Sequence, residues 1–381
     1  MKQYGNHKKL TDLCAIQYGF AFDSSYFNDS GDGLPLIRIR DVVRGFSETY
    51  YSGVYPPEYI VKEGDYLIGM DGEFNIAQWK GDEALLNQRV CKISTKSDSY
   101  SERFAYYFLS RVLKEIEDET PFVTVKHLSA KRLNQILTPV PPIKEQEGIC
   151  SLLDKLSLVI EKKKEQVKQL DNLAQSIFYD MFGDPVENEK GWEVKKMGEV
   201  GELQRGSGLS KKDLIDNGFP CILYGQIHTK FGAFTTKHIA CIPQELVKSA
   251  KIAHTGDVIM AITSEDVEGS CKSVAWMGDY DIAIGSDAAI YRHTMNGIYV
   301  SYYTQTKAFY YEKAKYANGF KVTHISTKEI ASIPIPVPPL SLQQSFAQKV
   351  EAIERQKELI NQSIAEVQTL FDSQMDYYFG E

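Results

Sequence analysis

Two stretches of the chain carry apolar residues at alternating spacings of four and three, which is typical of the seam of a coiled coil. The first seam comprises Ile149, Leu153, Leu156, Ile160, Lys163, Val167, Leu170 and Ala174, and the second comprises Phe346, Val350, Ile353, Lys357, Ile360, Ile364, Val367 and Phe371. A proline doublet precedes each stretch, and prolines permit the first turn of a helix but prevent it from extending backwards. We therefore predict two helices of about 30 to 38 residues, or roughly 45 to 57 Å at about 1.5 Å per residue.

These two stretches belong to a sequence that is written twice. Residues 125–184 align with residues 322–381 at a constant offset of 197 without a gap, and both copies contain a Pro-Val-Pro-Pro segment followed by a helical pattern. Upstream the correspondence continues with shifting offsets, as expected when loops differ in length on a common scaffold. Its landmarks there are Gly64-Asp65 against Gly256-Asp257, and Tyr106-Tyr107 with Arg111 against Tyr302-Tyr303 with Lys307.

The repeat divides the chain into four segments: the first head (1–142), a helical segment (143–184), the second head (185–339) and another helical segment (340–381). Both heads read as α/β units, because glycine and proline turns punctuate short apolar runs. The predicted fold is α+β, with two similar α/β domains separated by two long helices that form an antiparallel coiled coil, related by a pseudo-twofold internal repeat. The alternative is that each helix packs only on its own head. Each seam contains one lysine, which we expect to extend to water.

Polar side chains alternate with apolar ones in a short stretch of each head. In the first head, residues 36–40 predict a strand that places Arg38 and Arg40 on one face. In the second head, residues 222–228 predict a strand with Tyr224, Gln226 and His228 on one face. Such residues at period two suit contacts to base edges and phosphates. A solvated strand face is the alternative.

Further candidates for DNA contact lie outside these two stretches. They are Gln88, Arg89, Lys126, His127, Lys230, Lys321 and His324. His127 and His324 recur at the same place in heads that otherwise differ. An element common to both copies is better suited to a shared turn or a phosphate contact than to reading a particular base.

The distribution of charge leaves nucleic-acid binding open, although the chain has 381 residues and a net charge of −8. The helical segments hold most of the excess: 6 basic and 8 acidic residues in 143–184, and 3 basic and 7 acidic residues in 340–381. The heads are nearly neutral and can each present a basic face. No long apolar run predicts a membrane span, and from its polar start we expect no signal peptide. We expect a soluble, cytoplasmic protein.

The sequence predicts no catalytic residue and no metal ligand. Six cysteines are scattered without zinc-ligand spacing, so buried reduced thiols are expected. There is no nucleotide-binding glycine loop and no motif of an amino-methyltransferase. Asp65 followed by Gln78-Trp79-Lys80 is spaced like a nuclease site, but Gln78 cannot bind a metal as a carboxylate would.

Together the layout and several motifs resemble the specificity subunit of type I restriction-modification systems. The motifs are the Pro-Val-Pro-Pro start with Glu145-Gln146, the helix end Met181-Phe182-Gly183-Asp184-Pro185, and Gly191-Trp192-Glu193-Val194 at the start of the next head. The resemblance covers the whole chain, and its helical parts are the more specific. One departure is Leu342-Gln343 in the second copy, where Glu-Gln is usual.

The resemblance implies a non-catalytic subunit that reads double-stranded DNA. Each head would be a target-recognition domain for one half of a bipartite, asymmetric site, and the helices would set the spacing and dock two methyltransferase subunits, with restriction subunits joining later. This chain would bind no cofactor, because S-adenosylmethionine, ATP and magnesium would serve the partner subunits. A repeat-built protein-interaction scaffold without DNA binding is the alternative from another class.

Overall fold

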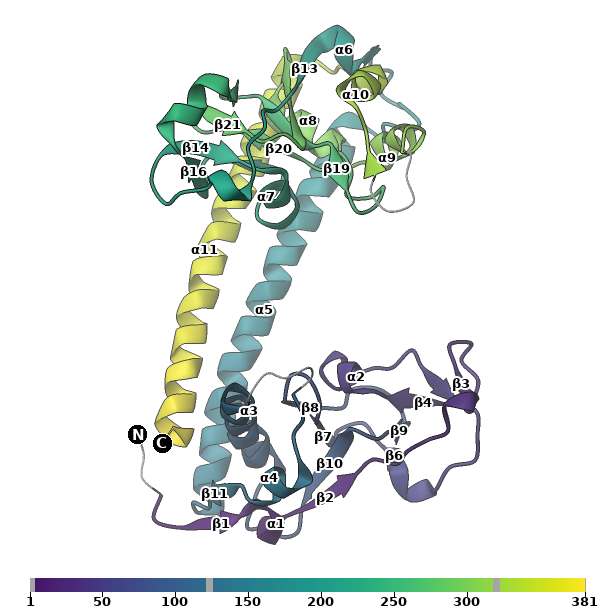
Figure 1. Cartoon of the computed structure of the whole chain (residues 1–381), viewed down its shortest axis with the longest axis vertical. Helices are drawn as coiled ribbons and strands as arrows, with labels where there is room; N and C mark the ends of the chain where they lie inside the picture. The colour runs from purple at the N-terminus through teal and green to yellow at the C-terminus, as the bar shows by residue number, and fades with distance from the viewer. Residues whose placement is uncertain (1–3, 121–125, 318–322, 381) are drawn as a thin grey trace. The chain divides into compact units, whose positions relative to one another are not determined.

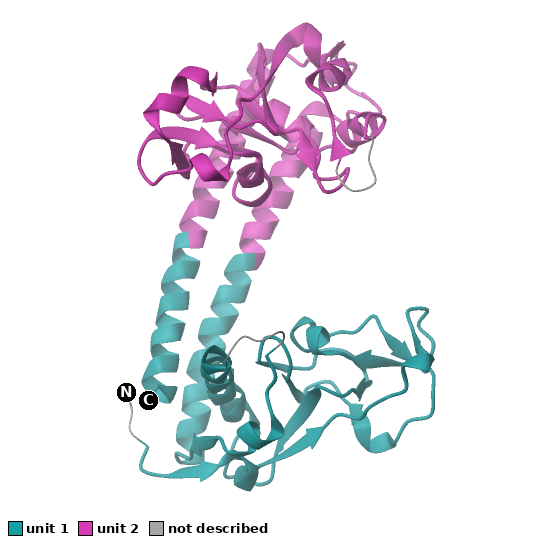
Figure 2. Cartoon of the chain, in the orientation of Figure 1, with its two compact units in different colours: residues 1–164, 362–381 teal, residues 165–361 magenta. Residues whose placement is uncertain are grey.

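The computed structural model describes residues 4–120, 126–317 and 323–380. The chain forms two compact units (Figure 2): residues 1–164 with 362–381, and residues 165–361. Each unit therefore contains one head and parts of both long helices. Within the described residues, no helix is both long and apolar enough to cross a membrane.

The first unit contains two sheets (Figure 1). The sheet with the longer strands, which we call the larger, is antiparallel and has the order β2 (Cys14–Tyr18), β10 (Val90–Thr95), β7 (Tyr66–Gly69) and β8 (Asn75–Gln78). The smaller has the order β3 (Phe27–Asn28), β5 (Tyr50–Tyr51), β4 (Leu34–Ile37), β9 (Ala84–Leu86) and β6 (Ile60–Val61), with β4 and β9 parallel. The other elements are the pair β1 (His7–Lys9) and β11 (Leu137–Pro139), and the helices α1 (Leu10–Leu13), α2 (Ile39–Arg44), α3 (Glu102–Glu119) and α4 (Ala130–Asn134).

The second unit repeats this arrangement. Its larger sheet has the order β13 (Gly201–Arg205), β22 (Ala288–His293), β18 (Val258–Ala261), β20 (Ser273–Trp276) and β15 (Phe234–Thr235). Its second sheet has the order β16 (Ala240–Ile242), β14 (Phe219–Ile222), β21 (Ile282–Ile284) and β17 (Lys251–Ala253), with β14 and β21 parallel. The other elements are the pairs β12 (Val194–Lys196) with β24 (Pro334–Pro336) and β19 (Thr263–Ser264) with β23 (Thr323–His324), and the helices α6 (Met197–Val200), α7 (Tyr224–Thr229), α8 (Gly297–Tyr303), α9 (Lys307–Ala314) and α10 (Thr327–Ser332).

A helix covers the larger sheet of each head. In the first head this is the 18-residue α3, whose N-cap Ser101 accepts a hydrogen bond from the Phe104 N–H. Because its apolar residues recur every three or four positions, they form one buried face against the sheet. In the second head the corresponding segment is broken into α8 and α9, and Thr306 caps the second helix through a bond from the Phe309 N–H.

The long helices are α5 (Ile143–Phe182) and α11 (Leu340–Phe379), each 40 residues and slightly longer than predicted. In the first unit the start of α5 packs with the end of α11, as the shared cluster of Leu153, Met375 and Phe379 shows. In the second unit the end of α5 packs with the start of α11, through Phe178 and Phe346 at a ring distance of 5.6 Å. Both pairings make the helices antiparallel, which confirms the predicted fold class.

The predicted seam residues all face inward, but they are not equally buried. Seven of them are buried: Ile149, Leu153, Ile160, Ala174, Phe346, Val350 and Ile353. The remainder are half-buried: Leu156, Val167, Leu170, Ile360, Ile364, Val367 and Phe371. All of these buried residues except Ile160 also belong to the core of a head, so packing between helices and packing on a head occur together.

One expectation about the seam lysines is wrong. The Lys357 side chain does not extend to water: it is 17% exposed, and its Nζ lies 2.6 Å from Asp171 Oδ1 and 2.7 Å from Glu354 Oε1. Burial lowers the pKa of Lys357, but the two carboxylates outweigh burial and raise it above its ordinary value. The helix segments of the second unit therefore contain a bound ion-pair cluster at this position.

All six cysteines are buried and unpaired, as expected from their spacing. Burial raises the pKa of five of the thiols to about 12: Cys14, Cys91, Cys150, Cys221 and Cys271. A thiol that does not ionise is a poor nucleophile. These cysteines are packing residues.

Candidate nucleic-acid interface

The two stretches predicted to be alternating strands begin in a strand but continue as short helices in the structure. The strand β4 ends at Ile37 and α2 begins at Ile39, with the Arg38 N–H bound to Asp41 Oδ2 at 2.9 Å. In the second head β14 ends at Ile222 and α7 begins at Tyr224, with the Leu223 N–H bound to Gln226 Oε1 at 3.0 Å. The physical reason is the same in both heads: a side chain in the first helical turn accepts the backbone N–H of the N-cap residue, which stabilises a helix start.

This correction changes which candidate side chains share a face. Arg38 caps α2, and Arg40 and Arg44 lie four residues apart on it, all three exposed. On α7, Tyr224 and His228 are four residues apart with ring centroids at 6.1 Å. Gln226 is half-buried and is used as the helix cap, so it does not share their face. Lys230, at the end of α7, is exposed.

In the first head, α2 lies beside β7 and β8 (Figure 1), and a charged cluster follows the end of β7. Asp71 Oδ1 is 2.5 Å from His127 Nδ1, and Asp71 Oδ2 is 3.6 Å from Arg89 Nε. Arg89 Nη1 is also 3.2 Å from His127 Nδ1. The backbone of Arg89 is left-handed, with φ 71°, which costs energy for a residue with a side chain. The structure thus brings two predicted residues together on Asp71, which the sequence did not single out.

The other candidates of the first head lie in different surroundings. Gln88 is exposed beside Arg89. Lys126 is half-buried, and its Nζ donates to the backbone carbonyl of Glu117 at 2.5 Å, so its bond is structural.

The second head has a cluster at the matching place, after the end of β18. His228 Nε2 is 3.3 Å from the Thr263 carbonyl oxygen, and Thr263 Oγ1 is 3.2 Å from His324 Nδ1. Lys272 Nζ donates to the His228 carbonyl oxygen at 2.9 Å. Two predicted residues, His228 and His324, are therefore connected through Thr263, which the sequence did not indicate, and Tyr224 lies against His228. Lys321 lies outside the described residues.

Backbone contacts show that the two clusters are equivalent. The Met70 carbonyl accepts from the Leu128 N–H at 2.8 Å, as the Ile262 carbonyl accepts from the Ile325 N–H at 3.1 Å. The Met70 N–H donates to the Arg89 carbonyl, and the Ile262 N–H donates to the Asp287 carbonyl. The position of Arg89 in the first head is thus held by an acidic residue in the second. Equivalent backbone positions therefore carry a positive side chain in the first head and a negative one in the second.

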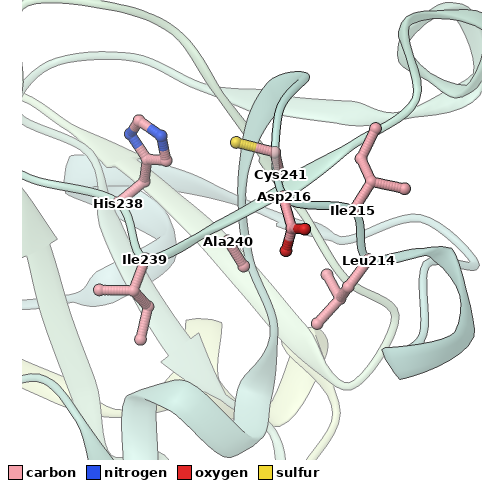
Figure 3. Close-up of a pocket in the computed structure, with 7 residues that line it drawn as sticks. All are labelled: Leu214, Ile215, Asp216, His238, Ile239, Ala240 and Cys241. Carbon is pink, nitrogen blue, oxygen red and sulfur yellow. The ribbon is translucent and has the colours of Figure 1, made fainter.

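Among the described residues of the second head, the structure shows a cavity at each of two places. One of about 460 Å³ is lined by two segments, 214–216 and 238–241, with the side chains shown in Figure 3, and no candidate DNA-contacting residue lines it. Another of about 580 Å³ includes Lys272, Lys307 and Lys313 in its wall and therefore adjoins the His228 cluster. Among the residues that the structure describes, no group of three His, Cys, Asp or Glu side chains could hold a metal ion.

Comparison with known proteins identifies similar sequences and folds. The family model described as type I restriction modification DNA specificity domain matches residues 5–170 and 189–369. The specificity subunit of the Escherichia coli type I restriction enzyme EcoBI is 48% identical over 166 residues, which cover 44% of this chain and 35% of that protein. The chain thus matches about a third of the length of that relative. The MjaVIII specificity subunit of Methanocaldococcus jannaschii is 22% identical over 320 residues, which cover 78% of this chain and 74% of that protein.

Two solved structures share the fold. The S subunit of a type I restriction-modification system from M. genitalium matches with a TM-score of 0.54 and 12% identity, over 97% of this chain and 94% of that one. A chain from a study of complex assembly and conformational transition in the type I R-M system matches with a TM-score of 0.56 and 19% identity, over 100% of this chain and 99% of that one.

Proposed function

The chain belongs to the family of type I restriction-modification DNA specificity domains, and from that premise we propose that it reads a bipartite, asymmetric DNA sequence. In this proposal residues 1–142 and 185–339 are target-recognition domains, and 143–184 and 340–381 are the helical spacers between them. Each head contacts one half of the site. The half-sites differ because the heads differ.

The observation that supports this proposal most directly is the pair of equivalent clusters with different chemistry. Both follow the end of a central strand and both include a histidine, His127 or His324. Around this shared frame the first head has Arg89 and the arginines of α2, whereas the second has Tyr224 and His228. Arginine suits guanine edges and phosphates, and a histidine or tyrosine offers different donors and stacking surfaces. To read two unlike half-sites, the heads need different side chains at equivalent backbone positions, and the two clusters have this arrangement.

We assign this chain a binding role without catalysis. Two methyltransferase subunits would dock on it and restriction subunits would join them. S-adenosylmethionine, ATP and magnesium would be bound by those partners. Counterion release makes DNA affinity fall steeply with salt, whereas a mostly apolar protein interface changes little. Titrating duplex DNA with the complex at rising salt therefore separates DNA binding from a scaffold that binds only proteins.

A graft tests the division between the heads. Replacing the segment from Met1 to Pro139 with the first head of another specificity subunit should replace one half of the methylated motif, and leave the other half and the spacer length unchanged. Methylated motifs are mapped before and after the graft in cells that carry the methyltransferase. If both halves change together, or neither changes, the two-head proposal is wrong.

Single substitutions refine the same test. Arg38→Ala or Gln88→Ala should alter discrimination within the first half-site only, because a good base-edge contact is worth roughly 1 to 3 kcal/mol. A lost phosphate contact instead weakens binding to all sequences alike.

A further inference from the structure

Each head contains a buried charged residue at a matching place, and the two charges have opposite signs. Glu117 on α3 is 8% exposed, and Lys313 on α9 is 4% exposed. The alignment that pairs Arg111 with Lys307 also pairs Glu117 with Lys313. Lysine and glutamate are almost never fully buried unless they are paired or hydrogen-bonded.

In the first head, the buried carboxylate binds the loop between β7 and β8. Glu117 Oε2 accepts a hydrogen bond from the Phe74 N–H at 3.1 Å. A carboxylate can only accept such bonds, and a bond to an ionised group is stronger than one between neutral groups. Glu117 therefore fixes the loop 70–74 at its last peptide.

In the second head, the buried ammonium binds the connection between β18 and β20. Lys313 Nζ donates to the carbonyl oxygens of Glu268 at 2.8 Å and of Ser270 at 2.5 Å. Burial lowers the pKa of Lys313 from its ordinary value, which agrees with an ammonium removed from water. An ammonium can only donate, so its charge matches the carbonyl groups that it meets.

Glu117 and Lys313 bind structurally equivalent peptide groups in the two heads. Gly69 faces Asn75 across one strand pair, and Ala261 exchanges backbone bonds with Lys272 and Cys271 across the other. The peptide before Phe74 therefore corresponds to the peptide before Cys271. One head holds this peptide by its N–H, the other by its carbonyl. Cys271 has a left-handed backbone, with φ 57°.

The segments held in this way carry the two candidate clusters. Loop 70–74 includes Asp71, which contacts Arg89 and His127. The connection 262–272 includes Thr263 and Lys272, which both bind His228. A shift of either segment would displace the candidate DNA-contacting side chains.

Resting on the proposed function, we propose that Glu117 and Lys313 are positioning residues for DNA recognition, each fixing the segment that carries the candidate contacts of its own head. The sign of each charge is matched to its own segment. A loop transplanted between the heads therefore needs its own anchor.

The test uses the full chain in complex with its methyltransferase subunits. Binding is measured to duplex DNA with the intact site, and to duplexes in which one half-site or the other is replaced. Lys313→Met should lower discrimination at the second half-site by about tenfold and leave the first half-site within about twofold. Lys315→Met is the matched control, because Lys315 is an exposed lysine of the same region whose Nζ binds the nearby Glu312 carboxylate.

The first head provides the reciprocal test. Glu117→Leu removes the acceptor of the Phe74 N–H and should affect the first half-site only. Glu117→Gln keeps an acceptor oxygen and should restore discrimination, whereas a role of the negative charge alone would not be rescued.

The outcomes distinguish failure of the positioning role from failure of the proposed function. If the unsubstituted complex does not discriminate either half-site, the proposed function fails. If it discriminates both but Lys313→Met behaves like Lys315→Met, the positioning role is wrong. Equal loss at both half-sites, or loss of the folded state seen by thermal unfolding, assigns Lys313 to general stability and also overturns the inference.

Discussion

The two heads are attached to the long helices by equivalent hydrogen bonds, which we call the joints. The heads differ in the exposed side chains that they present. In each, a buried glutamine at the start of a long helix ties that helix to the N-terminus of the helix covering the sheet. Gln146 Oε1 accepts from the Ser101 N–H, and Gln343 Oε1 accepts from the Asn296 N–H, both at 2.8 Å. Each amide also donates to a proline carbonyl just before its helix.

At the candidate interface the equivalence of geometry persists while the chemistry changes. Arg89 is replaced by Asp287, and the arginine-rich α2 by α7 with its aromatic pair. Duplication within one chain explains this division: joints must satisfy the same backbone groups in both copies, whereas exposed side chains are free to diverge. The comparison teaches where substitutions should act alike in both heads and where they should not.

The largest effect is expected where both copies bury the same seam position. Leu153 and Val350 are equivalent and both 0% exposed. Leu153→Asp and Val350→Asp should each lower the free energy of unfolding by about 3 to 5 kcal/mol, because an unpaired charge is left in a core. Ile364→Asp should cost about 1 to 2 kcal/mol, since Ile364 is only half-buried. Denaturant unfolding of the three variants measures these changes in the free energy of unfolding. Equal losses in all three would contradict the unequal burial of the seam residues.

The glutamine joints come next and should be symmetric. Gln146→Leu and Gln343→Leu each leave a backbone N–H and at least one carbonyl without a hydrogen-bond partner, which costs about 1 to 3 kcal/mol per group. We expect losses of about 2 to 4 kcal/mol in both copies. Gln→Glu at each position keeps the acceptor and is the milder control. A large loss in one copy alone would show that the joints are not equivalent.

The sequence predicted those joints only in part. The constant alignment over the last residues of each repeat was enough to predict the two long helices, because a heptad pattern is long and locally determined. It placed Gln146 and Gln343 at the helix starts but could not show their partners, which lie about 45 residues upstream at Ser101 and Asn296.

The error at the candidate interface has a local cause. Alternation over five to seven residues cannot distinguish a strand from a short helix. The signal that was missed is Asp41 or Gln226 three residues after the N-cap, which marks a helix start. Thr263 and Lys313 could not be found at all, because their importance comes from contacts distant in sequence.

Acidification should distinguish the units, because among the described residues the second has a half-buried histidine at the end of its long strand, where the first has a threonine. His293 occupies the place of Thr95, and burial lowers its pKa from 6.5 to about 4. The unfolded chain therefore binds more protons between these pH values, and stability is lost as pH falls from 6.5 to 4, by up to about 3 kcal/mol. Hydrogen exchange followed against pH should show the loss in residues 185–339, and His293→Thr should reduce it. An acid response confined to the first head would refute this assignment.

The smallest effect concerns a single exposed charge that can be moved between heads. Arg40 on α2 corresponds to Gly225 on α7, and a side chain added at Gly225 meets no atom within 4 Å. If Arg40 contacts a phosphate, Arg40→Gly should weaken binding to all sequences alike and lower the slope of log affinity against log salt by about one. Gly225→Arg should raise that slope by about one without changing the motif read.

Affinities of the complex for specific and unrelated duplexes, measured across a salt series, provide both numbers. Arg40→Lys is the control, because it keeps the charge and should keep the slope. A change of motif in Arg40→Gly would instead make Arg40 a base-reading residue. Since a phosphate contact carries no sequence information and a base contact does, the two variants decide whether the heads differ in what they read or only in how strongly they hold the backbone.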